Sequence, residues 1–239
     1  MNKFDSLLAD LENEASTSLD DKMNPFVKKD NSKAIACPWL NWRKDYTDAT
    51  PGKIQGVFIM QDWWCSSEPK EKDSPEKSLE YHVDYIRKNN FSSDPTIKNL
   101  WNAPSWKKAI WENKTWLVTN AVWGLRKGNI SSGYLGDTIH KAAFPIWAKL
   151  ISHFAGNNKD FKVVFAGGWA VFENAKFNDK NLNQYLKNWE KWAGKGTGKN
   201  DEVSKLGDTN VYGNAYFCCH PSVWNSNFNC LKGPPPNRV

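Results

Sequence analysis

The chain has 239 residues, of which 40% are hydrophobic and 24% charged, and its formal net charge is +6. This composition is typical of a globular domain with a full core, and no apolar run approaches the ~20 residues of a membrane-spanning helix. The N-terminus leads into an acidic stretch rather than a secretory signal, so the sequence predicts a cytoplasmic protein, or a nuclear one in a eukaryote.

The N-terminal segment carries apolar residues at helical spacing between residues 4 and 16, with acidic residues on the other face. This pattern predicts a short amphipathic helix, followed by a polar stretch up to residue 31. We therefore expect an N-terminal helical appendage over residues 1–34 and one α/β domain over residues 35–239.

Four apolar segments rich in β-formers divide the remaining chain. The first predicted strand begins at Gly56, and the other three cover residues 115–123, 161–170 and 210–219. Helical spacing is seen near residues 97–101 and 140–154. Strands that alternate with helices are typical of parallel sheets with right-handed crossovers. We predict a single α/β domain with a central, mainly parallel four-stranded sheet flanked by helices, and an insertion at about residues 178–208 that contains a flexible linker.

Cysteine and histidine patterns give no support for a metal or another cofactor. Five cysteines are an odd number, and Cys218 and Cys219 are adjacent, so reduced thiols are expected. The sequence contains no Cys-x-x-Cys, and its four histidines lack the spacing of zinc ligands. We predict no metal and no cofactor.

Fourteen tryptophans are the most unusual feature of the composition, and several lie beside lysine, as in Trp106-Lys107-Lys108. Aromatic residues interleaved with lysines suit an opened or single-stranded nucleic acid, because bases stack on the rings and phosphates need cations. Packing of large aromatic side chains explains the same pattern equally well. Composition alone leaves both interpretations open.

Polar side chains follow the predicted strands. Asp62 comes directly after the first strand, Asn120 ends the second, and His220 follows the fourth. Ligands of open parallel sheets bind outside the carboxyl ends of the strands, so an acid and an imidazole are expected to face one crevice. A structural alternative for Asp62 alone is that it caps the following helix.

The ordered set of these segments resembles the uracil-DNA glycosylase superfamily. The family's Gly-Gln-Asp-Pro-Tyr-His, strand-Asn, Trp-Gly and His-Pro-Ser motifs are similar to segments 60–65, 118–121, 167–170 and 220–224, and a Pro-Ser-Leu-x-Asn segment is similar to 95–100. The resemblance spans roughly residues 57–225, and its specificity lies in the order of the motifs rather than in any one of them.

The resemblance implies a base-flipping DNA glycosylase that acts as a monomer on single- or double-stranded DNA, with no membrane partner. Asp62 would orient water and stabilise the sugar cation, and His220 would donate to the departing base. The implied substrate-binding residues are Gln61, Trp64, Phe91 and Asn120, and the implied DNA-binding residues are Thr96, Ser222, Val223 and Trp224.

Departures from the family pattern leave the substrate open. Trp64 stands where the family has the tyrosine that excludes the thymine methyl group, Met60 replaces glycine, and Cys65 replaces histidine. Uracil is the favoured substrate. The alternatives are a modified pyrimidine, such as a modified cytosine in foreign DNA, and a catalytically silent member that binds DNA or a protein.

Overall fold

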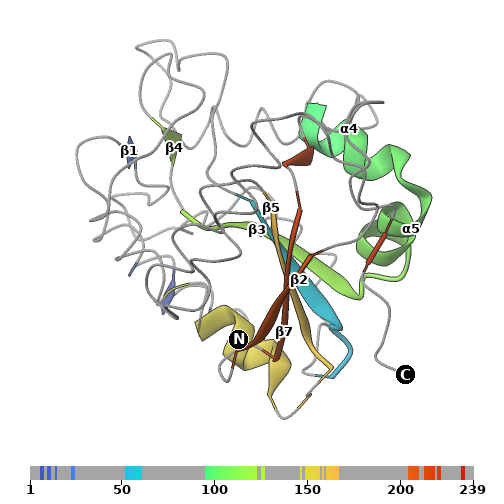
Figure 1. Cartoon of the computed structure of the whole chain (residues 1–239). Helices are drawn as coiled ribbons and strands as arrows, with labels where there is room; N and C mark the ends of the chain where they lie inside the picture. The colour runs from blue at the N-terminus through green and yellow to red at the C-terminus, as the bar shows by residue number, and fades with distance from the viewer. Residues whose placement is uncertain are drawn as a thin grey trace.

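The structure is a computed structural model that describes about a third of the 239 residues (Figure 1). The described ranges are residues 52–60, 95–122, 125–126, 149–156, 160–166, 204–209, 213–218, 220–221 and 233–234, together with residues 6, 7, 10, 11, 14, 23, 24, 146 and 158.

A five-stranded sheet forms the centre of the described part. Its strand order is β3-β2-β5-β7-β6. The bounds are Gly56–Met60 for β2, Trp116–Asn120 for β3, Lys162–Ala166 for β5, Ser204–Thr209 for β6 and Gly213–Cys218 for β7. β2 pairs in parallel with β3 and β5, β5 pairs in parallel with β7, and β6 is antiparallel to β7. The α/β class predicted from the sequence is confirmed.

The antiparallel strand β6 was not predicted. Its residues, Ser-Lys-Leu-Gly-Asp-Thr, fall at the end of the stretch expected to be an insertion with a linker. The segment contains glycine and few β-formers, so its strand conformation depends on pairing with β7 rather than on local preference. The pairing is irregular between Lys205 and Gly207, where the register shifts.

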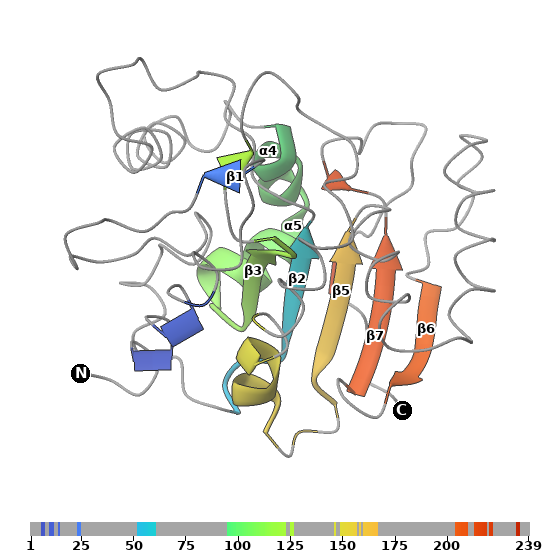
Figure 2. The same ribbon diagram turned by 90° about the vertical axis from the view of Figure 1, so that its left-hand side faces the viewer.

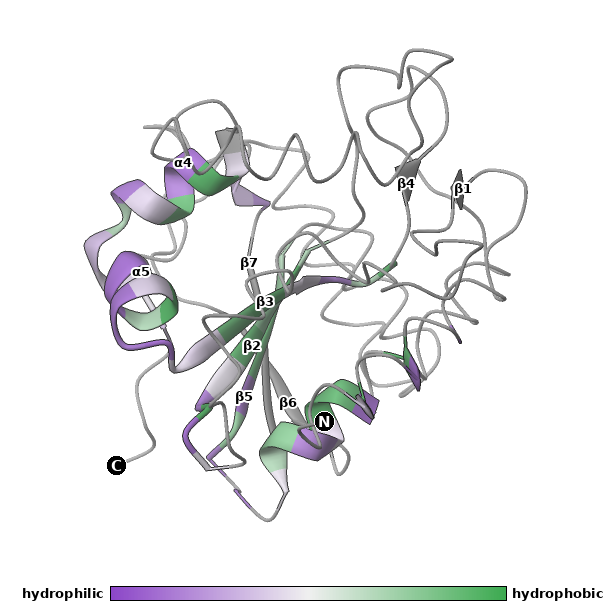
Figure 3. Cartoon of the chain, turned by 180° about the vertical axis from the view of Figure 1, so that it is seen from behind, coloured by the Kyte–Doolittle hydropathy of each residue, from purple (hydrophilic) through white to green (hydrophobic). Residues whose placement is uncertain are grey.

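Helical layers cover both faces of the sheet. Every residue of β2, β3 and β5 is buried, as expected for parallel strands that are covered on both sides. α4 and α5 lie on one side of the sheet and the helical residues 149–155 lie on the other (Figures 1 and 3). Figure 3 also shows that these strands are largely hydrophobic, whereas α4 and α5 carry hydrophilic segments.

The first helical layer is built from three consecutive short elements: α4, Pro95–Asn102; α5, Pro104–Lys107; and the π-helix η1, Lys108–Glu112. Pro104 starts α5, and Ala103 before it is extended (φ −87°, ψ 104°), because a residue before proline avoids the helical region. After η1 the chain turns at Lys114, which has a φ of 54°. It then enters β3.

An aromatic cluster joins this layer to the sheet. Trp106 packs edge-on against Phe58 and against Trp116, with ring centroids 5.0 Å apart in each pair. The three rings are fully buried. Packing is therefore the correct interpretation for Trp106, and its indole cannot stack on a base.

The opposite layer includes the N-terminal segment. Leu150, Ile151 and Phe154 are buried under the sheet, and Leu11 from the N-terminal helix is 1% exposed. The Nζ of Lys149 donates to Glu14 at 2.5 Å. These contacts anchor the described N-terminal residues to the domain, while the predicted boundary at residue 34 stays a prediction.

A second, two-stranded pairing was also not predicted. β1, Met23–Asn24, is antiparallel to β4, Leu125–Arg126. The first of these segments falls in the polar stretch expected up to residue 31. Two-residue strands are too short to show the alternation by which a strand is detected in a sequence.

Gly56 permits close approach of two neighbouring strands. A Cβ at this position would lie 2.6 Å from the carbonyl oxygen of Lys162 and 2.6 Å from Cη2 of Trp116. We expect Gly56→Ala to lower the free energy of unfolding by about 1–3 kcal/mol, because the core must shift to admit the methyl group. Urea denaturation measures this loss. Gln55→Ala, at the exposed neighbouring position, is the control, and equal stabilities of the two variants would contradict the prediction.

Candidate functional site

The carboxyl ends of the parallel strands form one edge of the sheet (Figure 2). Met60 at the end of β2 is aligned with Asn120 at the end of β3, and the amide of Ala121 extends the ladder by donating to the Met60 carbonyl at 2.6 Å. On the other side, Ala166 of β5 is aligned with Cys218 of β7. The residues that follow these strands therefore leave the sheet at the same edge.

The strand order creates a switch point at this edge. The chain leaves β2 toward β3 and leaves β5 in the other direction, toward β7, although β2 and β5 are neighbours. Loops that diverge in this way leave a crevice between them, which is where open α/β sheets bind their ligands. Asp62 follows β2 by two positions in the sequence and lies outside the described residues.

Asn120 is the predicted site residue that the sheet holds most firmly. Its side chain is 2% exposed, and its backbone is fixed by the register with Met60. The Oγ1 of the preceding Thr119, which is fully buried, donates to the Asn120 carbonyl at 3.4 Å. A buried amide at a strand end offers a donor and an acceptor from a position that the sheet fixes.

His220 lies two residues beyond the end of β7 and is partly buried. Burial lowers the pKa of its imidazole from 6.5 to about 4. The ring is consequently neutral at pH 7, with one nitrogen that donates a hydrogen bond and one that accepts. A neutral imidazole can stabilise a developing negative charge as a donor without first carrying a positive charge.

Asn99 connects α4 to the loop that carries His220. Its Nδ2 donates to the carbonyl of Pro221, across 122 positions of the sequence. This hydrogen bond ties the residue next to His220 to the middle of α4. Asn99 was not among the predicted site residues, although it lies in the segment that resembles the family's Pro-Ser-Leu-x-Asn motif; that motif was the available signal.

Of the other predicted residues, Thr96 is in the first turn of α4 and is 9% exposed. Its proposed contact with phosphate stays a prediction. The remaining predicted site residues, Gln61, Asp62, Trp64, Phe91, Ser222, Val223 and Trp224, lie outside the described residues. The structure thus brings Asn120 and His220 to one edge of the sheet and Thr96 to a helix that contacts the same loop.

Within the described residues, no group of three or more histidine, cysteine, aspartate or glutamate side chains could hold a metal ion. The helices of this part of the chain are also too short or too polar to cross a membrane.

The neutral state of His220 predicts an acid-dependent loss of stability. The imidazole has a pKa of about 4 in the folded protein and 6.5 as its ordinary value, so unfolding takes up a proton between these pH values. The contribution of this imidazole to the free energy of unfolding is therefore fully present above pH 6.5. It is lost as the pH is lowered toward 4, by at most roughly 3 kcal/mol.

Urea denaturation across this pH range measures the effect. His220→Gln removes the titrating group, so the wild type should lose more stability than the variant as the pH falls from 6.5 to 4. If the stability of the wild type and that of the variant changed with pH in parallel, the imidazole would have an ordinary pKa in the folded protein.

A scan of protein-family models finds no match to this chain, and a search of curated proteins finds none either.

Proposed function

We propose that the protein is a DNA glycosylase that flips a base out of DNA and hydrolyses its N-glycosidic bond, with uracil as the favoured base. The observation that carries the proposal is the common edge at which β2, β3 and β7 end, with Asn120 and His220 described there and Asp62 two residues after β2. This common edge supports the proposal that three residue types with different chemical capacities share one crevice.

The reaction needs charge stabilisation on two partners. As the bond between the sugar C1′ and the base nitrogen breaks, positive charge builds on the sugar and negative charge on the base. The Asp62 carboxylate would stabilise the sugar and orient a water molecule, whose oxygen adds to C1′. One proton of that water is released, and the departing base ends with a proton on nitrogen. The products are the free base and an abasic sugar.

His220 and Asn120 would act on the base. The low pKa of His220 supports a neutral donor that stabilises the charge on a pyrimidine carbonyl oxygen, without the need to transfer its proton. The amide of Asn120 offers an acceptor and a donor together, which suits the uracil edge with its N–H next to a carbonyl. Its burial supports a role in selectivity, because a rigid amide discriminates between bases more sharply than a mobile one.

The direct test is a panel of labelled oligonucleotides that carry uracil, a thymine mismatch, hypoxanthine or a modified cytosine, in single-stranded and duplex form. Incubation with the full chain followed by alkaline cleavage reveals abasic sites. Cleavage at uracil alone is the expected result. Release of a modified cytosine without release of uracil would make the modified cytosine the substrate in place of uracil. The absence of cleavage in every oligonucleotide would overturn the proposal of an enzyme.

A further inference from the structure

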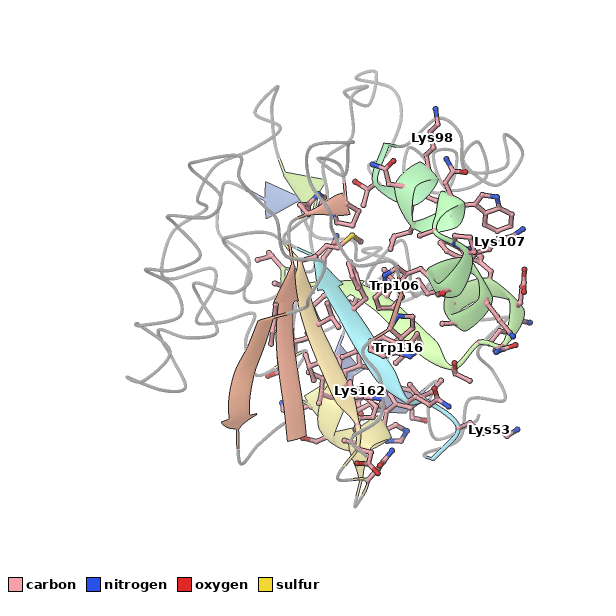
Figure 4. All side chains as sticks on the ribbon, turned by 45° about the vertical axis from the view of Figure 1, so that its right-hand side comes forward. Lys53, Lys98, Trp106, Lys107, Trp116 and Lys162 are labelled. Carbon is pink, nitrogen blue, oxygen red and sulfur yellow. The ribbon has the colours of Figure 1, made fainter. Side chains whose placement is uncertain are left out.

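The outer side of the first helical layer carries an unusual concentration of positive charge. Residues 95–114 contain four lysines and one glutamate, so this short segment supplies +3 of the chain's formal +6. Lys98, Lys108 and Lys114 are exposed. Figure 4 shows Lys98 and Lys107 directed away from the sheet, whereas Trp106 lies between the helices and the sheet.

Two partly exposed indoles lie among these lysines. Trp101 of α4 and Trp111 of η1 meet edge to face, with ring centroids 5.2 Å apart and planes at 75°. The Nζ of Lys107 lies 4.6 Å from the centre of the Trp101 ring. Lys98 precedes Trp101 by three residues, which puts the two side chains on the same side of α4. We call Lys98, Trp101, Lys107 and Trp111 the outer row.

The outer row adjoins the candidate site. Asn99, next to Lys98 in α4, is hydrogen bonded to Pro221, next to His220. α4 has eight residues and is therefore about 12 Å long. A strand of DNA with one base held near His220 has only a few nucleotides to cross before it meets the outer row.

We propose that the outer row is a second DNA-binding surface, which holds single-stranded DNA beside the flipped base. The lysines meet phosphates, and a base stacks on the exposed part of the indole pair, as in other single-strand grooves. Glu112, the one acid of the segment, lies 3.8 Å from Lys107 and offsets part of its charge. The proposal rests on the proposed function for the choice of DNA as the nucleic acid and for the flipped base near His220.

Binding of an undamaged oligonucleotide tests this surface apart from catalysis. We use a fluorescein-labelled oligothymidylate of about 12 nucleotides, which lacks uracil, and follow its anisotropy between about 50 and 200 mM salt. Lys98→Ala should weaken binding and reduce the slope of log K against log salt by about 0.7, because one phosphate contact is lost. Trp101→Ala should weaken binding about 5- to 100-fold, from the loss of one stacked base.

Two further variants test whether binding depends on this surface or only on the overall charge of the protein. Lys53→Ala removes the same charge from an exposed lysine at the other end of the sheet and should leave the slope unchanged (Figure 4). Glu112→Gln removes the acid of the outer side and should strengthen binding. Lys98 is exposed, so its variant keeps the fold even where Trp101→Ala destabilises it.

Three results would overturn the proposal. These are equal losses for Lys98→Ala and Lys53→Ala, absence of binding at low salt, and equally strong competition by oligoglutamate, which would assign the surface to an acidic protein instead. Uracil excision is measured on the same variants. Normal binding without excision would contradict the proposed function, whereas excision without binding to the outer row would contradict only this inference.

Discussion

Asp62→Asn and His220→Ala should each lower the rate of uracil excision under single-turnover conditions by about 10² or more. In the proposed mechanism, the first change removes the negative charge that would stabilise the sugar cation, and the second removes the donor that would face the departing base. Both groups would act in the transition state under this proposal, so DNA binding should be nearly unchanged. Quenched-flow sampling with a uracil oligonucleotide measures the rate, and anisotropy measures the binding.

The pH profile distinguishes a neutral His220 from a charged one. With a pKa of about 4, the imidazole stays neutral through the neutral range, so excision should not fall between pH 6 and 8 through its titration. A charged donor with the ordinary pKa would lose activity across the same range. Lys53→Ala is the control for both variants, because this exposed lysine lies at the opposite edge of the sheet. Rates equal to wild type in Asp62→Asn and His220→Ala would refute the catalytic assignment.

Local sequence patterns predicted those strands whose own residues supply the stabilising contacts. β2, β3 and β5 are runs of apolar β-formers that are buried on both faces, so the sequence signal and the structural cause are the same. β6 lacks this signal because its pairing partner β7 supplies the stabilising contacts. Its glycine and polar residues are typical of a loop when they are considered without that partner.

The position of Trp106 shows how a pattern can mislead. Its neighbours Lys107 and Lys108 suggest an exposed basic and aromatic surface. Trp106 and Ile110 are four residues apart, however, and both are buried on the side of the helix that faces the sheet. Lys107 leaves the helix on the other side, where it meets Trp101. The helical period, rather than adjacency in the sequence, separates the core residue from the surface residue.

The candidate site was predictable only in part, for a related reason. Strand ends are visible in the sequence, and parallel pairing brings them to one edge whatever the loops contain. The hydrogen bond between Asn99 and Pro221 joins residues 122 positions apart, and no local pattern encodes that distance. Contacts of this kind depend on the packing of α4 against α5, and Trp106 of α5 joins this layer to the sheet.

Trp106→Ala should therefore have the largest effect on stability, a loss of about 3–5 kcal/mol in the free energy of unfolding. The change removes a fully buried indole that contacts Phe58 of β2 and Trp116 of β3, and it leaves a cavity between the helices and the sheet. Domains are stable by only about 5–15 kcal/mol, so this variant should be close to unfolding at physiological temperature.

Urea and thermal denaturation measure this loss, and Trp101→Ala is the matched control. Trp101 is partly exposed and carries the same indole, so its removal should cost distinctly less stability than the removal of Trp106. Trp106→Phe should recover part of the loss, because a smaller ring still contacts one neighbour. The two tryptophans then differ in both measurements: Trp106→Ala acts on stability, whereas Trp101→Ala acts on DNA affinity. A small loss for Trp106→Ala would mean that the helices do not depend on this cluster to pack on the sheet.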